Sequence, residues 1–573
     1  MGFDEASEEK NAPSVQPLPS TQSQTTDLQT LPNDCEKVHS TRLSTSEIAT
    51  DEEQGSPDTE PLGFVRTIRG FRWFLVVAGT LSTVTLYALD NTIVADITPA
   101  IVNSLGEVEK TPWISVGFFL GGLSTIFMAG KVYTLFDAKY LYIASTALFM
   151  VGSAICGAAS SMDMEIIGRV LAGIGGNAMY CGVLTILSVN TTDAERPSIL
   201  GLTGMVWGVS TILGPVVGGA LELYDWRFAF YINLFIGALF APILIFIVPR
   251  YNPRQGQTER IRLREFDYIG IVLSMGAFVA ILMLINLGGT IYAWSSGSMI
   301  ALYVVTPLCW TALFAQQIFV FGTTRTQRIL PLDLLSSKEP LLITIVFAST
   351  IGAMFVPIYY IPLYFQFTRG DSAILAAVRL LPLIVLYVFV VLVTSQALPR
   401  LPRYKWYFTL GNLISLPGMV ILSRMDESTS KATIYGASIL IGVGSGFIGQ
   451  NPYAVVQGIL PIKSRHNATT LMTVAQIGGA TFSLGIAGAI FFNLGLSSLQ
   501  QLLPDAASDQ IQGVLTGTSG DLYKTLSAAQ QQDVVRAIVT TMRQTFIVGY
   551  VGNAVGLLCG LGMKDQSMFV GGS

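Results

Sequence analysis

This sequence of 573 residues has a composition that excludes an ordinary water-soluble protein, because 51% of it is hydrophobic and only 12% is charged. Soluble domains carry about 25% charged residues. A mean hydropathy of +0.56 and 56 glycines fit helices that pack closely within a bilayer. The chain is therefore predicted to be a polytopic membrane protein. Its formal net charge of −4 does not indicate a nucleic-acid partner.

Residues 1–70 differ from the rest of the chain and are predicted to form a disordered, acidic cytoplasmic tail. Within residues 1–60, thirteen side chains are acidic and three are basic, and runs such as STQSQTTDLQT are almost entirely polar. Such a segment cannot bury a core. No short apolar region followed by small residues is visible here, so no cleaved signal peptide is expected.

Fourteen stretches after the tail are long and apolar enough to cross a membrane, which requires about 20 residues. Backbone groups in lipid must be hydrogen-bonded within the segment, so each stretch is predicted to be a helix. The pattern is least distinct in the stretches that begin near Phe266 and Tyr404. The predicted spans are 73–94, 113–136, 140–160, 166–189, 199–222, 227–248, 267–288, 300–321, 341–364, 372–396, 404–424, 432–455, 468–493 and 544–563.

Lysine and arginine are distributed unevenly between the connecting loops. If the tail is cytoplasmic, the inner loops hold sixteen of these residues and the short outer loops hold five. Basic residues favour the cytoplasmic side, so both termini are predicted to be cytoplasmic. The one long outer connection, 494–543, contains the amphipathic stretch SAAQQQDVVRAIVTTMRQTF, which predicts an interfacial helix leading into the last span.

A carboxylate interrupts the first span at Asp90, within LDNTIVADITPAIV. The residues from Trp73 to Leu89 rise about 25 Å at 1.5 Å each, which places Asp90 in the outer part of the membrane. Arg169 lies three residues after the start of the inward-running fourth span, at a matching depth. Charges within a membrane require partners, so these two side chains are predicted to pair. The alternative is that Asp90 only terminates the first helix at the headgroups.

Glycine recurs in the fifth span, GVSTILGPVVGGAL, at a spacing that lets two helices pack backbone to backbone. The proline in this stretch removes a backbone donor and is expected to kink the helix. Two interpretations stay open: ordinary tight packing, or a hinge that seals a carrier against leaks. The residues concerned are Gly208, Gly214, Pro215, Gly218 and Gly219.

Polar residues in the later spans are candidates to line a cavity. Gln450 and Asn451 end the glycine-rich run of GVGSGFIGQNPY, which predicts a broken or bent helix near a cavity. Tyr364 and Gln366 lie in FVPIYYIPLYFQF, which is either an aromatic belt at the membrane interface or the wall of a drug site. Arg379 lies about eight residues inside the tenth span and requires a partner that the sequence does not identify.

Cysteine and histidine are too scattered to form a metal site or a disulfide framework. The cysteines within spans, Cys156, Cys181, Cys309 and Cys559, are predicted to be small buried thiols. The chain also lacks the G-x-x-x-x-G-K-[ST] loop of nucleotide-driven pumps. No metal and no resident cofactor are expected.

Several of these motifs resemble those of the drug/proton antiporter branch of the major facilitator superfamily, in its fourteen-helix fungal form. LDNTIVADITPAIV resembles the branch's signature in the first helix, and Arg169, Gly173 and Gly175 match R-x-x-x-G-x-G-x in the fourth. The fifth span is similar to the antiporter motif G-x-x-x-x-x-G-P-x-x-G-G. DWRFAFYINLFIGA and AAVRLLP also resemble that branch, and the resemblance covers roughly residues 70–565.

The loop between the second and third spans departs from the family pattern G-x-x-x-D-R-x-G-R-K. GKVYTLFDAKY keeps Gly130 and Lys139, but it has Thr134 at the aspartate position and Asp137 at the later glycine position. Asp137 is expected to substitute in the cytoplasmic gate, which would comprise Gly130, Asp137 and Lys139.

The resemblance implies an all-α major facilitator fold with two six-helix bundles plus two additional helices, working by alternating access. The bundles would be 71–250 and 331–565, the linking helices would lie in 251–330, and 566–573 would be a cytoplasmic C-terminus. Asp90 and Arg169 would couple transport to the proton gradient. The cavity candidates are Tyr87, Asn91, Asn177, Tyr364, Gln366, Arg379, Gln450 and Asn451.

The function that the resemblance implies is export of small, mostly hydrophobic toxins, drugs or secondary metabolites in exchange for protons. The expected partners are the substrate, protons and the lipid bilayer, and the protein is expected to be a monomer in the plasma membrane, with the vacuolar membrane as the alternative. A same-fold carrier of a basic amino acid or siderophore is less favoured, because Asp90 is the clearest intramembrane carboxylate. A non-transporting sensor usually needs a long folded cytoplasmic extension, which the sequence does not predict. An enzyme is not expected.

Overall fold

A computed structural model describes residues 68–107, 110–256, 258–289, 291–461, 464–516 and 521–569. The predicted tail, up to residue 67, and the last four residues of the chain lie outside the described residues. Within the described part the chain is helical, and the only extended pairings are isolated bridges between Gly288 and Tyr292 and between Arg403 and Ser567. The all-α prediction is confirmed.

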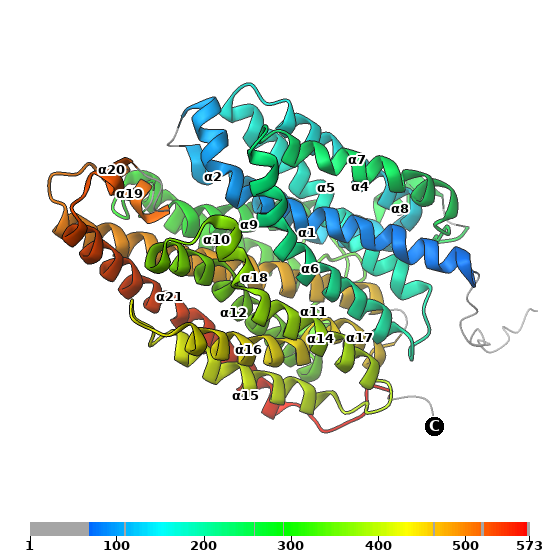
Figure 1. Ribbon diagram of the computed structural model, residues 1–573. Helices are drawn as coiled ribbons and strands as arrows, with labels where there is room; N and C mark the ends of the chain where they lie inside the picture. Colours follow the sequence, from blue (N-terminus) through cyan, green and yellow to red (C-terminus); the bar gives the residue numbers. More distant parts are fainter. Residues whose placement is uncertain are drawn as a thin grey trace, which may run out of the picture. The chain divides into compact units, whose positions relative to one another are not determined.

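The first group of helices packs into one bundle, which we call the first bundle (Figure 1). In it α5 lies against α4 and α2, while α1 packs on α6 and α7. Its helices are α1 (Phe71–Leu105), α2 (Thr111–Ser124), α3 (Ile126–Leu135), α4 (Ala138–Gly157), α5 (Met162–Val189), α6 (Arg196–Glu222), α7 (Phe228–Pro242) and the π-helical turn η2 (Ile243–Ile247).

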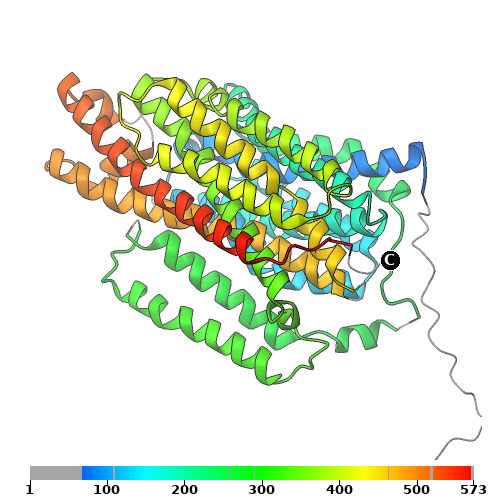
Figure 2. The same ribbon diagram turned by 90° about the horizontal axis from the view of Figure 1, so that it is seen from below.

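A linking segment follows, and its two long helices form an antiparallel pair beside the bundles (Figure 2). One of them, α9, packs against α2 of the first bundle and also against α18 of the second. The helices of this segment are α8 (Glu259–Arg264), α9 (Tyr268–Leu287), α10 (Gly297–Phe319) and α11 (Leu332–Leu335).

The remaining helices form the second bundle, in which α12 packs on α21 and α18, and α16 packs on α15 and α14. The two bundles meet mainly where α6 lies along α14 and where α3 meets α18. Its helices are α12 (Lys338–Arg369), α13 (Ala373–Val378), α14 (Leu381–Ala397), α15 (Tyr404–Leu422), α16 (Lys431–Ile448), α17 (Asn451–Ile459), α18 (Arg465–Leu502), α19 (Ser508–Thr516), α20 (Asp521–Thr525) and α21 (Ala528–Gly562).

Thirteen helical segments of the described chain are long and apolar enough to cross a membrane. The fourteenth predicted span is present as α15, which is too polar to meet that criterion but lies side by side with α16 and α21. Its polar residues bond to neighbouring helices: Asn412 accepts from Thr350 of α12 at 2.9 Å, and Ser415 accepts from Asn553 of α21 at 3.0 Å. Such bonds explain how a less apolar helix is accommodated within a bundle.

Breaks divide three of the predicted spans. The prediction of a broken twelfth span is confirmed, because α16 ends at Ile448 and α17 begins at Asn451. Gly449 between them has φ of 41°, a left-handed value that favours glycine. The second span is likewise divided into α2 and α3, and the tenth into α13 and α14.

The expected interfacial helix before the last span is not separate. The amphipathic stretch forms the first turns of α21, which begins with a capping box formed by Ser527 and Gln530 and continues without a break to Gly562. A capping box satisfies backbone donors at the start of a helix, so it fixes where α21 begins. The connection between α18 and α21 contains the short helices α19 and α20.

Candidate functional site

An ion pair lies in the interior of the first bundle. Arg169 of α5 donates from Nη1 to Oδ2 of Asp90 on α1 at 2.5 Å, and the side chains are 2% and 0% exposed. The other carboxylate oxygen of Asp90 accepts from Asn233 of α7 at 2.8 Å, and Asn233 also donates to Ser153 of α4 at 3.1 Å. The structure therefore brings together the two charges whose depths the sequence matched.

The position of Asp90 within α1 decides between the two sequence interpretations. Helix α1 continues past Asp90 to Leu105, so the alternative that Asp90 terminates the first helix is wrong. Burial of two charges costs several kcal/mol per ion unless hydrogen bonds compensate it. Here Arg169 also donates from Nε to the carbonyl of Ile114 at 3.2 Å, and its guanidinium stacks over Phe118 with 4.4 Å to the ring centroid.

Aromatic rings from both bundles gather next to this ion pair. Tyr87, one turn before Asp90, stacks on Tyr180 at 5.8 Å between centroids and meets the edge of Trp207 at 5.7 Å. Trp207 in turn contacts Phe355 of α12 at 6.2 Å. Gly176 permits the contact, because a Cβ there would lie 2.6 Å from the ring of Tyr87. We call Tyr87, Tyr180, Trp207 and Phe355 the aromatic cluster.

Several buried polar atoms have no hydrogen-bond partner among the described residues. Both amide atoms of Asn177 on α5, both of Gln450, and Nε1 of Trp207 are in this state. The Cγ of Gln450 lies close to Gly204 of α6, where the bundles meet. Buried polar atoms are nearly always paired in proteins, so unpaired ones are suited to hold the polar groups of a ligand.

The other predicted cavity residues have different surroundings. Asn451 is satisfied within the second bundle, where it accepts from Ser395 and donates to Thr394 and a backbone carbonyl. Tyr364 is buried and donates to the carbonyl of Asp426. Gln366 and Asn91 are half-buried on α12 and α1. These contacts give Asn451 and Tyr364 a structural use that the sequence did not reveal.

Arg379 does not lie inside a continuous helix as expected. It follows α13 at the break before α14, donates to Asp371 at 2.8 Å and to the hydroxyl of Tyr435 at 2.8 Å, and stacks over Phe365. Asp371 is therefore the partner that the sequence could not identify. A charge at a helix break can reach a loop residue, which removes the need for a partner deep in the membrane.

The residues of the expected cytoplasmic gate are used differently from one another. Gly130 of α3 touches the second bundle, since a Cβ there would lie 2.3 Å from Oγ1 of Thr470 on α18. Asp137 instead caps α4 by accepting from the backbone N–H of Lys139 at 2.9 Å. No ion pair of Asp137 with the second bundle occurs among the described residues.

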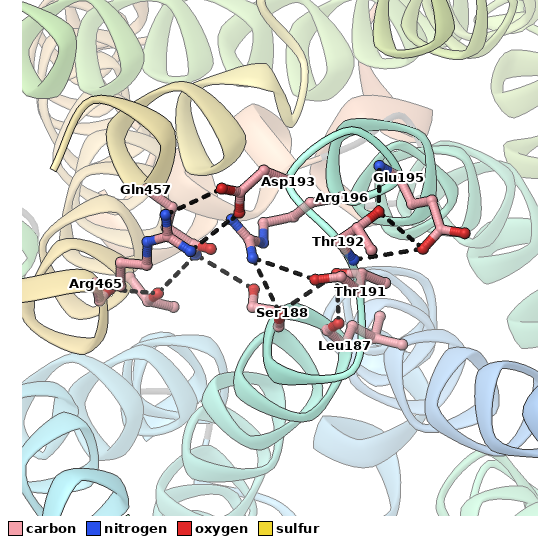
Figure 3. A network of polar contacts seen from close by, with 10 residues as sticks. Leu187, Ser188, Thr191, Thr192, Asp193, Glu195, Arg196, Gln457 and Arg465 are labelled. Carbon is pink, nitrogen blue, oxygen red and sulfur yellow. Dashed lines mark hydrogen bonds and ion pairs between the residues drawn. The ribbon is translucent and has the colours of Figure 1, made fainter. Parts of the chain in front are cut away.

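An ion pair across the bundles is present at a different loop (Figure 3). Asp193, between α5 and α6, accepts two bonds from Arg465 at the start of α18, at 3.0 and 3.1 Å. Arg196 lies 2.7 Å from the same carboxylate. Gln457 of α17 reaches Ser188 of α5 at 3.2 Å. We call Ser188, Asp193, Arg196, Gln457 and Arg465 the latch.

The latch carboxylate is held in its charged form. Burial raises the pKa of Asp193, but the guanidinium groups of Arg196 and Arg465 outweigh burial and keep the pKa below its ordinary value of 3.8. Arg196 itself is buried and also donates to the carbonyls of Ser188 and Thr191. Asp193 is thus suited to hold the bundles together and unsuited to exchange protons near neutral pH.

The glycines of α6 pack against two different neighbours. A Cβ on Gly214 would lie 2.1 Å from Oγ1 of Thr92 on α1, while one on Gly208 would lie 2.6 Å from Val388 of α14. Gly218 is buried, Gly219 approaches Ile374, and α6 runs unbroken through Pro215. The tight-packing interpretation is confirmed, and a hinge stays a prediction.

Sequence reasoning missed several residues of this site. Asn233 was part of the quoted stretch DWRFAFYINLFIGA, where a lone amide in an apolar run was the available signal. Asp193 and Arg465 lie in the connections between the predicted spans, where charged residues are common and carry no signal of pairing. The aromatic cluster residues Tyr180 and Trp207 could not be separated from ordinary apolar positions.

Comparison with known proteins agrees with this architecture. The Major Facilitator Superfamily matches residues 79–484 of the chain. A phomenoic acid biosynthesis cluster MFS-type transporter of Leptosphaeria maculans is 43% identical over 536 residues, which cover 90% of this chain and 85% of that protein. Efflux pump DEP3 of Alternaria brassicicola is 37% identical over 525 residues, covering 91% of this chain and 92% of that protein.

The human organic anion transporter MFSD10 (TETRAN) has a similar fold. Its crystal structure aligns with 85% of this chain and 100% of its own, with a TM-score of 0.51 and 11% sequence identity. This likeness concerns the fold alone. The match to the superfamily and the identity to full-length transporters are sufficient to assign the family. The chain belongs to the Major Facilitator Superfamily.

Proposed function

We propose that this protein is a secondary active exporter, which moves small, mostly hydrophobic compounds across the membrane in exchange for protons. The observation that carries the proposal is the buried pair of Asp90 and Arg169, a carboxylate at a depth where a charge must have a purpose and a partner. Relatives named as an efflux pump and as a transporter of a biosynthesis cluster support export of small compounds by a transporter rather than an enzyme.

A proton arriving at Asp90 would remove the negative charge that holds Arg169. The guanidinium would then lack its ionic partner in a buried site, and the contacts among α1, α5 and α7 through Asn233 would rearrange. Deprotonation restores the pair. Two states of the pair therefore favour two arrangements of the first bundle, which is the requirement for coupling a proton to alternating access.

The proposed cargo is largely apolar with a few hydrogen-bonding groups. The aromatic cluster offers flat apolar surface from both bundles, and Asn177, Gln450 and Trp207 offer unpaired amide and indole groups. Binding sites of this composition, mostly aromatic with a small number of polar groups, suit neutral compounds of drug size.

The latch supplies the closing contact of this cycle. It joins the α5–α6 loop to the start of α18, at the end of the helices that the basic loops predict to be cytoplasmic. Opening toward that side would break the bonds of Arg465 to Asp193. We further propose that both termini are cytoplasmic, that the protein works as a monomer in the plasma membrane, and that the proton gradient is the only energy source.

The test is transport into proteoliposomes with an imposed pH gradient, using a panel of hydrophobic fluorescent compounds. Uptake should follow the gradient, stop when a protonophore is added and ignore ATP. Asp90→Asn, which keeps the shape but cannot exchange a proton, should abolish gradient-driven uptake, whereas Glu222→Gln at the exposed end of α6 should leave it unchanged. Uptake that persists without the gradient and follows ATP would contradict the proposal.

A further inference from the structure

A second carboxylate is buried close to the ion pair and has no role in the mechanism above. Glu165 lies in the first turn of α5 with no exposed surface, and neither carboxylate oxygen has a hydrogen-bond partner among the described residues. Apolar residues of the same region surround this end of the first bundle, among them Ile114, Met162 and Trp226. An ionised carboxylate without donors is costly in such a place, so the group must hold either a proton or a cation.

Glu165 is placed to share the cation of Asp90. It precedes Arg169 by four residues on α5, so the two side chains lie on one face, one turn apart. The guanidinium is bonded to Asp90 and to the carbonyl of Ile114. Side chains four residues apart on a helix are neighbours, so the same guanidinium is placed to interact with Glu165 as well as with Asp90.

Two further groups near Glu165, Cys156 and Arg227, have other interaction partners. Cys156 of α4 donates its thiol to the backbone carbonyl of Glu165. Arg227, before α7, donates to the carbonyl of Ala159 and lies 3.7 Å from Asp225. Arg169 and Asp90 are the other charged groups of the described residues that interact electrostatically with Glu165.

The nearest acid on the same helix has a different environment. Asp163, two residues before Glu165, is 68% exposed and accepts from Lys110 at 2.6 Å. It is therefore satisfied at the surface and outside the buried group. This difference makes Asp163 a matched control for Glu165.

We propose that Glu165 is a second proton-binding carboxyl, which exchanges a proton with Asp90 while Arg169 serves both as counter-ion. The inference rests on the proposed proton coupling. In the transfer the O–H bond of Glu165 breaks, the proton bonds to a carboxylate oxygen of Asp90, and Arg169 turns to the newly ionised Glu165.

The charges of this group balance before and after the transfer. With Glu165 neutral, Asp90 negative and Arg169 positive, the three groups sum to zero, and they sum to zero again when the two acids exchange states. No net charge is created in the bundle interior, so the transfer avoids the cost of an isolated buried charge. The pair observed between Arg169 and Asp90 corresponds to the state in which Glu165 holds the proton.

The first experiment detects that proton directly. Infrared spectra of the purified protein in lipid, recorded at neutral pH in H2O and D2O, should contain a protonated-carboxyl band that shifts on deuteration. The band should be absent from Glu165→Gln and present in Asp163→Asn. An unmodified protein without such a band, or a Glu165→Gln spectrum that retains it in full, would overturn the inference.

The second experiment measures coupling. Glu165→Gln should lower gradient-driven uptake by at least about tenfold, because positioned proton carriers contribute about 100-fold or more. Exchange of labelled for unlabelled substrate without a gradient should persist, which also shows that the variant is folded. Glu165→Asp, which keeps an acid, should restore part of the coupling with a displaced pH profile, and Asp163→Asn should behave as the unmodified protein.

These outcomes separate the inference from the proposed function. Gradient-driven uptake by Glu165→Gln at the unmodified rate and with the unmodified pH profile would overturn the role of Glu165 while leaving proton antiport intact. Uptake by the unmodified protein that ignores the pH gradient would contradict proton antiport itself, and the infrared band would still decide whether Glu165 holds a proton.

Discussion

Removing the latch carboxylate should shift the protein toward the conformation that is open at the latch. Asp193 lies between two guanidinium groups, Arg196 at 2.7 Å and Arg465 at 3.0 Å. Asp193→Asn therefore removes an attraction and also leaves two positive charges near each other. Arg465→Gln removes only the attraction, because Arg196 still neutralises the aspartate.

The free energy that the ion pair of Asp193 and Arg465 contributes to the latch depends on how far the two side chains are exposed to solvent. The side chains of Asp193 and Arg465 are 43% and 24% exposed, so solvent screens their attraction. Exposed ion pairs contribute about 0.2–1 kcal/mol, and two parallel bonds place this one near the upper end. About 1 kcal/mol changes a two-state population by about fivefold. Asp193→Asn should increase the population that is open at the latch by more than fivefold, and Arg465→Gln should increase it by about fivefold at most.

Distance measurement between spin labels tests this order. Ala194→Cys and Asn467→Cys place labels on exposed positions on either side of the latch, in a background whose native cysteines are replaced. The long-distance population should grow in Asp193→Asn more than in Arg465→Gln. Equal distance distributions in all variants, or a larger effect of Arg465→Gln, would refute the electrostatic account of the latch.

Three further outcomes are expected. Because the pKa of Asp193 is lowered, its carboxylate contributes fully to the latch above the ordinary value of 3.8, and this contribution is lost only as the pH falls through the lower folded value. The distances between the spin labels should therefore not change between about pH 5 and 8. Gly214→Ala should lower the Tm, because a Cβ there would lie 2.1 Å from Oγ1 of Thr92 and overpacking costs about 1–3 kcal/mol. Gly436→Ala should leave the Tm unchanged, because no atom of the described residues lies within 4 Å of a Cβ at that position. Gln450→Leu should raise the KM for hydrogen-bonding substrates and leave the Tm unchanged. Asn451→Leu should lower the Tm, because it removes hydrogen bonds within the second bundle. The reverse pattern would contradict the proposal that Gln450 binds the transported compound.

The pairing of Asp90 with Arg169 could be predicted because membrane depth is a one-dimensional constraint. A helix rises 1.5 Å per residue, so counting from the ends of two spans is enough to match two charges. The break at Gly449 was equally accessible, since a glycine and a following proline have local conformational effects.

The latch and the role of Asp137 could not be predicted in this way. Residues outside the predicted spans, such as Asp193, Arg465 and Asp371, are not bound to a depth. Neither the pairing of Asp193 with Arg465 nor that of Arg379 with Asp371 therefore follows from counting. Asp137 was assigned from its place in a family pattern, but its side chain is used to cap α4. An aspartate side chain that accepts a backbone N–H at the start of a helix is not free to form the ion pair that the family pattern implied.

Because α9 packs against both α2 and α18, the two lateral junctions between the bundles differ in how far they are exposed to the surrounding lipid. The two bundles meet along two seams, and α9 covers the seam where α3 meets α18. Two hydrogen bonds hold the linking segment there: Trp294 donates to Asn493 of α18, and Lys131 of α3 donates to the carbonyl of Thr326. The other seam, between α6 and α14, carries exposed apolar side chains such as Val209 and Leu213. Within the described part of the chain, a compound dissolved in the bilayer would therefore meet an uncovered junction of the bundles along α6 and α14.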